Sequence, residues 1–389
     1  MTRLAVNDEE LVTCVACGLC LPHCPTYRVT GDESASPRGR IAAMRAVHSG
    51  TAPLDTEFTR YMTECVQCRA CEAACPSSVA FGHLMEGARE TLAAETSTVP
   101  WWQRLGYSVL EHHRLLVGLS RLLALAQRAR LVPRRLGVPH LPLRSSPLTA
   151  TGHDVWLFPG CVMDAWQREV HAAVMRVLRA AGVDVAIPDP RRAPCCGALH
   201  VHAGLHDRAQ ALARRVVEAF PGDAPILVDS AGCGAALQDY GHLLGTDEAR
   251  AFSRRVVDVH QWLAARLDRL PATVAGPVPP VVAVHDPCHL RHVQKAHLAV
   301  RAILSRYVPV VELDDDGLCC GAGGAYAALQ PELGTAIRER KLHAIERTGA
   351  SVVASANPGC TWFLAAAGVD IRHPLEIVDA ALTARPRRP

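Results

Sequence analysis

Two cysteine quartets with identical spacing constrain this chain more than any other feature of its sequence. Both follow the pattern C-x2-C-x2-C-x3-C-P, once as CVACGLCLPHCP and once as CVQCRACEAACP. In this pattern three closely spaced thiolates hold one cubane cluster, and the fourth cysteine ligates the other. We therefore predict two [4Fe–4S] clusters, the first held by Cys14, Cys17, Cys20 and Cys75, and the second by Cys65, Cys68, Cys71 and Cys24.

Zinc is the alternative metal for two sets of four cysteines. Structural zinc sites more often use two C-x2-C pairs separated by a long spacer. The matching quartets, each closed by Pro25 or Pro76, differ from that arrangement. Ligand type alone does not exclude zinc, so a zinc scaffold without redox activity stays open as an alternative.

The stretch between the quartets has helical periodicity. Ile41, Met44 and Val47 recur at helical spacing, and Phe58, Tyr61 and Met62 do so further on. Ser36 followed by Pro37 is typical of an N-cap and first helical position. We expect a helical ferredoxin domain over residues 1–95, with no compact two-hairpin insertion.

Sixteen cysteines in 389 residues also bear on where the protein works. The first residues show no apolar core of a signal peptide, and no run of eighteen apolar residues occurs. A cytoplasmic location is expected, where thiols stay reduced and patterned cysteines serve metal or redox chemistry. A formal net charge of +3 gives no reason to expect nucleic acid as a partner.

The remaining eight cysteines form a repeat of a single cysteine, an adjacent pair and another single cysteine. Short β-rich runs precede the single cysteines and helical stretches fill the gaps, as in residues 165–182, where Val170, Val174, Val177 and Leu178 share one face and Gly182 ends the helix. This alternation predicts α/β domains with mainly parallel sheets, at residues 151–270 and 271–389. Sites in such sheets gather at the carboxyl ends of the strands. The candidate ligands of a further cluster or redox site are Cys161, Cys195, Cys196 and Cys233, then Cys288, Cys319, Cys320 and Cys360.

The fold class predicted is therefore α+β and multidomain. A helical two-cluster domain is followed by a basic helical linker over residues 96–150 and two repeated α/β cysteine-rich domains. Residues 101–150 carry eight arginines and one acid, Glu111. Leu115, Leu116, Leu119, Leu122 and Leu123 make an apolar stripe there. Such a helix packs between domains with its arginines solvated, or lies on an anionic membrane or a partner; the first interpretation is slightly favoured.

The order of these motifs resembles a known family. The two CCG motifs resemble the cysteine-rich repeat of the heterodisulfide reductase group. With GLCLPHCPTY, SPRGRI, HDPCHLRHVQ and NPGC, nearly the whole chain is similar to the iron–sulfur subunits of glycolate oxidase. The resemblance implies an electron-transfer subunit of an oxidoreductase. It would accept electrons from FAD-linked oxidase subunits that turn glycolate into glyoxylate, and pass them to a quinone or similar acceptor, at the inner face of the cell membrane.

Histidines also match positions of that family. His202, His285 and His292 are candidates for tuning a cluster or relaying protons. Arg38 and Arg69 lie near or within the quartets and are candidates for raising cluster potentials. The chain has no phosphate-binding glycine motif, so FAD is expected only on a partner and no catalytic residue is assigned here.

The chain departs from the fuller pattern of the heterodisulfide reductase group in one respect. That pattern ends each repeat in C-x2-C, whereas Ala236 and Phe363 stand at the last position here. A four-ligand cluster, a cluster completed by another residue and an empty thiol site all stay open. The alternatives for function are the same relay serving a lactate, glycerol-3-phosphate or other 2-hydroxy acid dehydrogenase, and a thiol–disulfide enzyme like heterodisulfide reductase.

Overall fold

The computed structural model describes residues 3–133, 138–143, 148–189, 191–193 and 195–383. The chain divides into two compact units, which are described separately. The N-terminal unit comprises Met1–Tyr107, Gly197–Ala209 and Leu318–Leu342, and the C-terminal unit comprises Ser108–Cys196, Gln210–Gly317 and His343–Pro389. The predicted domain boundaries stay a prediction. Parts of the predicted linker and of the last domain, at 134–137, 144–147 and 384–389, lie outside the described residues.

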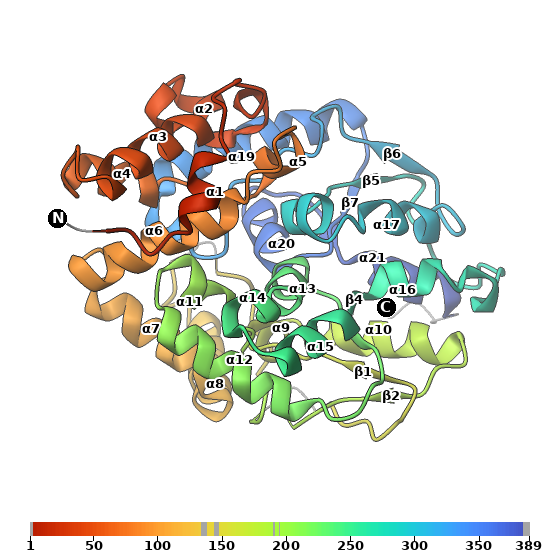
Figure 1. The fold of residues 1–389 in the computed structure, drawn as a ribbon. Helices are drawn as coiled ribbons and strands as arrows, with labels where there is room; N and C mark the ends of the chain where they lie inside the picture. Colours follow the sequence, from red (N-terminus) through yellow and green to blue (C-terminus); the bar gives the residue numbers. More distant parts are fainter. Residues whose placement is uncertain (1–2, 134–137, 144–147, 190, 194, 384–389) are drawn as a thin grey trace. The chain divides into compact units, whose positions relative to one another are not determined.

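The N-terminal unit is helical, as the sequence predicts (Figure 1). The predicted helices form as α3 and α4, and their apolar stripes are buried in the core. Ser36 caps α3 by accepting a hydrogen bond from the Gly39 backbone N–H, with Pro37 at the first helical position. The helices are α1 Asp8–Val12, α2 Pro25–Thr30, α3 Pro37–His48, α4 Thr56–Thr63, α5 Ala70–Ala73, α6 Phe81–Glu95, α7 Trp101–Glu111, α11 Ala198–His202, α18 Tyr326–Leu329 and α19 Pro331–Thr348, of which α7 and α19 continue into the C-terminal unit.

The two quartets share one backbone geometry. Ala16 and Gln67, at equivalent motif positions, have φ of 55° and 56°, and Gly18 and Arg69 have φ of 85° and 60°. Non-glycine residues rarely adopt this left-handed region, and it persists where the surroundings require it. Here it folds each C-x2-C loop tightly, so that the Gln67 N–H donates to Cys65 Sγ at 3.4 Å.

The C-terminal unit contains two four-stranded parallel sheets with the same topology. Their strand orders are β2-β1-β3-β4 and β6-β5-β7-β8, so the two cysteine-rich domains are structural repeats. This confirms the predicted α/β fold class. The strands are β1 Val155–Leu157, β2 Val185–Ala186, β3 Ile226–Val228, β4 Val256–Asp258, β5 Val282–Val284, β6 Val310–Glu312, β7 Val352–Ala354 and β8 Ile371–Arg372.

Helices connect and cover these strands. The helices of this unit are α8 His113–Arg128, α9 Val162–Trp166, α10 Arg168–Ala180, α12 His206–Ala219 (begun in the N-terminal unit), α13 Ala231–Gln238, α14 Tyr240–Leu244, α15 Asp247–Arg255, α16 Val259–Ala264, α17 His297–Leu304, α20 Pro358–Ala365 and α21 Pro374–Leu382, with a π-helix at His289–Val293. The predicted helix forms as α10, which buries its valine and leucine face. Gly182, with φ of 73°, follows its end.

One continuous apolar core joins the two repeats. Leu157 and Leu227 of the first sheet belong to the same buried cluster as Val284 and Val352 of the second. Helix α10 packs on α21, and α16 packs on α17. These are equivalent pairings, because α10 corresponds to α17 and α16 to α21 in the repeat, so the two repeats are related by a pseudo-twofold axis.

Helix α8 shows both faces of the amphipathic pattern. Leu116 is buried with Ser120 and Ala124, so one side of the helix packs against the protein, and packing between two domains stays a prediction. Leu119 and Leu122 are 43% and 62% exposed, which leaves an apolar stripe facing outward. Among the described residues, no helix is long and apolar enough to cross a bilayer.

A buried histidine–aspartate network links the two repeats. His171 contacts the Asp229 carboxylate through Nδ1 at 2.6 Å and the Pro159 carbonyl through Nε2 at 2.8 Å. Burial opposes the charge, but the Asp229 carboxylate outweighs it and raises the pKa of His171. His373 Nε2 donates to the Asp229 backbone carbonyl at 3.0 Å, and its Nδ1 accepts from the Leu375 N–H. This histidine is therefore neutral.

The network predicts loss of stability in acid. Burial and the neighbouring His260 lower the pKa of His373 to about 3, whereas an unfolded histidine titrates near ~6.5. The unfolded chain thus binds the proton first, so stability is complete above ~6.5 and falls toward pH 3, by at most about 1.4 kcal/mol per pH unit. The variant His373→Asn, which keeps the cap acceptor, should flatten this slope in urea unfolding between pH 7 and 5. Replacement of the exposed His343 is the control, and an unchanged slope in His373→Asn would contradict the assignment.

Candidate iron–sulfur centres

The second predicted ligand set lies around one small cavity. Cys24, from the first quartet, lines this cavity together with Cys65, Cys68 and Cys71 of the second. All four are buried. Burial, together with the neighbouring Cys68 and Cys65, raises the pKa of the Cys71 thiol well above its ordinary value. Four thiolates would be costly to hold here without positive charge to balance them.

The first ligand set is more exposed. Cys14, Cys20 and Cys75 pack at the edge of the helical core, and Cys17 is exposed. Burial raises the pKa of Cys20, opposed by the backbone N–H of Arg38, which donates to it. The structure thus brings Cys24 to the second quartet, and it places Cys75 against the same core as Cys14 and Cys20. Ligation itself stays a prediction.

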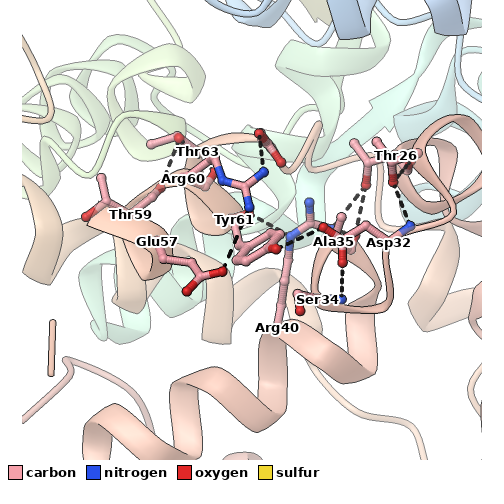
Figure 2. A network of polar contacts seen from close by, with 12 residues as sticks. Thr26, Asp32, Ser34, Ala35, Arg40, Glu57, Thr59, Arg60, Tyr61 and Thr63 are labelled. Atoms are coloured by element: carbon pink, nitrogen blue, oxygen red, sulfur yellow. Dashed lines mark hydrogen bonds and ion pairs between the residues drawn. The ribbon is translucent and has the colours of Figure 1, made fainter. Parts of the chain in front are cut away.

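Arg40 supplies the positive charge at the second set. Its side chain is only 1% exposed and lines the cavity of the four cysteines. Figure 2 shows its guanidinium reaching between α2 and α4, donating to the Tyr61 carbonyl at 2.7 Å, to the Thr26 hydroxyl at 3.2 Å and to the Ala35 carbonyl. Nη1 lies 4.0 Å from Cys24 Sγ. None of these partners carries a carboxylate.

Arg40 also provides the test of whether the cavity suits a cluster. Its Nη2 is buried and has no hydrogen-bond partner among the described residues. A buried unpaired guanidinium N–H is expensive unless a ligand accepts from it. Four thiolates with a cationic donor beside them fit a [4Fe–4S] cluster, which accepts hydrogen bonds through its sulfurs and takes up an electron.

The two arginines predicted from the sequence have a different role. Arg38 donates to the Glu33 carboxylate at 2.6 Å, and Arg69 donates to Glu72 at 2.9 Å. Their charges are therefore largely compensated. Arg40 was missed, although a signal was present: it shares a helical face with Met44 and Val47, where an apolar residue is expected.

The first cysteine-rich repeat gathers its four thiols in one unit. Cys161 Sγ lies 3.7 Å from Cys195 Sγ, and Cys196 Sγ lies 3.4 Å from Cys233 Sγ. Two thiolates on one tetrahedral metal at ~2.3 Å would lie ~3.8 Å apart. The Cys196 sulfur and burial raise the pKa of Cys233 well above its ordinary value. Metal binding here would therefore have to displace thiol protons.

The second repeat divides its cysteines between the units. Cys288 and Cys360 belong to the C-terminal unit, and Cys319 and Cys320 to the N-terminal unit. In the C-terminal unit, a ring nitrogen of His285 lies within 4.8 Å of Cys360 Sγ, and Asn357 Nδ2 donates to that sulfur at 3.4 Å. In the N-terminal unit, the Gly321 N–H donates to Cys319 Sγ at 3.3 Å.

The three histidines chosen from the sequence lie in different settings. His285 follows β5, close to Cys360. His292 lies in the π-helix after Cys288. His202 ends α11 in the N-terminal unit, where its carbonyl accepts from Arg89 at 2.7 Å. His285 is therefore placed beside a cysteine sulfur, and the tuning or relay roles of all three histidines stay predictions.

A helical domain with two cysteine quartets, followed by two cysteine-rich α/β domains, defines an iron–sulfur protein. Comparison with known families agrees. The family described as "4Fe-4S dicluster domain" matches residues 10–79. The family described as "Cysteine-rich domain" matches residues 155–238 and again residues 282–365.

Individual relatives extend over nearly the whole chain. A probable glycolate oxidase iron-sulfur subunit of Bacillus subtilis is 33% identical, covering 91% of this chain and 88% of the relative. The glycolate oxidase iron-sulfur subunit of Escherichia coli is 32% identical, covering 98% and 96%. One subunit of the dihydromethanophenazine:CoB–CoM heterodisulfide reductase of Methanosarcina barkeri is 28% identical, covering 92% and 88%. This chain belongs to the family of glycolate oxidase iron–sulfur subunits, whose members are subunits of oxidoreductases.

Replacing Arg40 is expected to change the midpoint potential of one cluster only, the cluster at Cys24. Arg40→Met should lower the midpoint potential of the cluster at Cys24 by roughly 50 to 150 mV, because a nearby unpaired cation favours the added electron. Arg40→Lys should lower it less. The measurement is an EPR-monitored redox titration, with Arg69→Met as the control. An unchanged potential with full iron content would contradict this role. Cys24→Ser should alter the same spectrum that Arg40→Met shifts, as the crossed ligation requires.

Proposed function

We propose that this chain is the electron-relay subunit of a glycolate dehydrogenase complex. A partner bearing FAD oxidises glycolate to glyoxylate, and this chain carries the electrons toward a quinone or similar acceptor. The observation that supports this most directly is the cavity where Cys24 joins Cys65, Cys68 and Cys71 beside Arg40. The names of the relatives from Bacillus subtilis and Escherichia coli point to the same donor.

The residues of this chain have limited tasks in such a relay. A [4Fe–4S] cluster supplies one-electron storage and transfer. The protein holds the thiolates, excludes water from the second set and balances its charge through Arg40. Glycolate oxidation releases two electrons and two protons, so two one-electron carriers match one turnover. The flavin chemistry belongs to the partner.

The first cysteine-rich repeat is proposed as an additional metal site. Its two close sulfur pairs match the edges of tetrahedral metal coordination. Cys161 and Cys195 are buried with Leu116 and Leu212 in a small apolar cluster, which would shield such a site from solvent.

A thiol–disulfide enzyme is the second candidate for the function of this chain, and the relative from Methanosarcina barkeri favours it. Ala236 and Phe363, in place of the last cysteines, weigh against it.

The acceptor is proposed to lie at a membrane. Helix α8 presents Leu115, Leu119 and Leu122 outward, flanked by Arg114 and Arg121, and it contains no acidic residue. An apolar stripe bordered by cations suits an anionic lipid surface, where the leucines enter the interface.

The full chain should co-sediment with vesicles rich in anionic lipid. Leu119→Glu should weaken this co-sedimentation, whereas Leu298→Glu on α17 should not. Equal sedimentation of both variants would exclude α8.

The donor is tested with the assembled complex. Purified anaerobically with its FAD-bearing partner, the complex should lose visible iron–sulfur absorption on addition of glycolate, with two electrons taken up per glycolate. The isolated chain should show no change. A faster reduction by lactate or glycerol-3-phosphate would reassign the donor, and disulfide reduction by the isolated chain would favour the second candidate.

A further inference from the structure

A second, larger cavity lies wholly within the N-terminal unit, beside the second cluster site. Its volume is about 370 Å³, within the range of small-molecule sites. Cys65 and Val66 of the second quartet form part of its wall. The rest of the wall combines apolar or aromatic side chains (Leu92, Val99, Pro100, Tyr107, Leu199 and Leu329) with polar ones (Thr59, Thr98, Gln103 and Gln330).

One polar group in this wall lacks a partner. The Tyr326 side chain is 5% exposed and lines the cavity, and its hydroxyl has no hydrogen-bond partner among the described residues. Burial raises the pKa of Tyr326, so the hydroxyl keeps its proton and is available as a donor. A buried tyrosine hydroxyl normally has a partner, because leaving it unpaired costs about 1 to 3 kcal/mol. This group therefore points to an acceptor atom on a ligand.

One arginine lines the cavity, but its guanidinium is already engaged and is not free for an anionic ligand. Arg89 lines it and donates to the backbone carbonyls of Met62, Thr63, Cys65 and His202. None of these partners is a carboxylate, so the charge is spread but not neutralised. The wall thus offers no free guanidinium to pair with a small carboxylate such as glycolate. It favours a flat, apolar molecule that gains negative charge when reduced.

We propose that this cavity binds the head group of a quinone, with the Tyr326 hydroxyl donating to one ring carbonyl oxygen. The assignment rests on the proposed relay function, because an electron acceptor has to approach the second cluster site, and Cys65 of that site lines the cavity. The apolar residues contact the ring faces, and Arg89 favours electron uptake by its charge. Complete reduction adds two electrons and two protons to the quinone and yields the quinol. The reduced clusters supply the electrons and water supplies the protons.

The segments that form the wall favour a binding site for an electron acceptor rather than an empty packing cavity. Leu199, His202 and Ala203 come from the segment after the first CCG motif, and Gly323, Ala325 and Tyr326 from the segment after the second. Both segments fold into the N-terminal unit, although they lie far from it in sequence. The cavity therefore brings together the second quartet and both CCG segments.

The test measures binding rather than turnover. The full chain, purified anaerobically with its iron, is titrated with menadione and with a short-chain ubiquinone by calorimetry. Tyr326→Phe should weaken binding about tenfold, the equivalent of one hydrogen bond. Ala203→Leu, which fills the cavity, should abolish binding. Tyr307→Phe is the matched control, because that hydroxyl donates to the Pro271 carbonyl away from the cavity.

The outcomes separate this proposal from the relay function. Iron content and dithionite-reduced spectra are measured for every variant, so that misfolding is not mistaken for lost binding. Clusters that reduce normally in a chain that binds neither quinone would overturn the cavity assignment and leave the relay intact. Equal affinity in wild type, Tyr326→Phe and Ala203→Leu would also overturn it. Binding of an alkyl detergent with the same affinity and the same variant pattern would identify an acyl-chain site instead.

Discussion

The structure depends on placing a cation against a buried set of thiolates. The four cysteines of the second set lie in a low-dielectric cavity, where mutual repulsion would otherwise keep their protons on. Arg40 lies beside them, held by carbonyl and hydroxyl groups and by no acid. Helices α2, α3 and α4 together build this arrangement (Figure 2). Arg38 and Arg69 sit closer to the cysteines in sequence, yet each is paired with a glutamate.

In the C-terminal unit, the candidate sites lie on two sheets whose strands are short. No strand in its two sheets exceeds three residues, so the sheets alone provide little stability. The shared apolar core, the α10–α21 and α16–α17 packing and the buried His171–Asp229–His373 network hold the repeats together. Cys161 and Cys233 follow β1 and β3 of the first sheet, and parallel topology brings strand ends to the same edge.

Local pattern was sufficient to predict much of this fold. Apolar spacing predicted α3, α4 and α10, and alternating strands and helices predicted the parallel sheets. The cysteine spacing predicted the grouping of Cys24 with Cys65, Cys68 and Cys71, which line one cavity, and ligation by any of the sets stays a prediction. What could not be predicted depends on contacts distant in sequence. The inclusion of residues 197–209 and 318–342 in the N-terminal unit, the burial of Arg40 and the unpaired Tyr326 hydroxyl all arise from packing that no local periodicity records.

We propose that this chain stores and passes electrons through two clusters in its helical unit. The most direct measurement is iron and acid-labile sulfide per chain after anaerobic purification, followed by EPR during stepwise reduction. Two cubanes should give about eight iron atoms per chain and two reducible signals, with any further metal lost in Cys195→Ser. Zinc in place of iron, with no reducible signal, would contradict it.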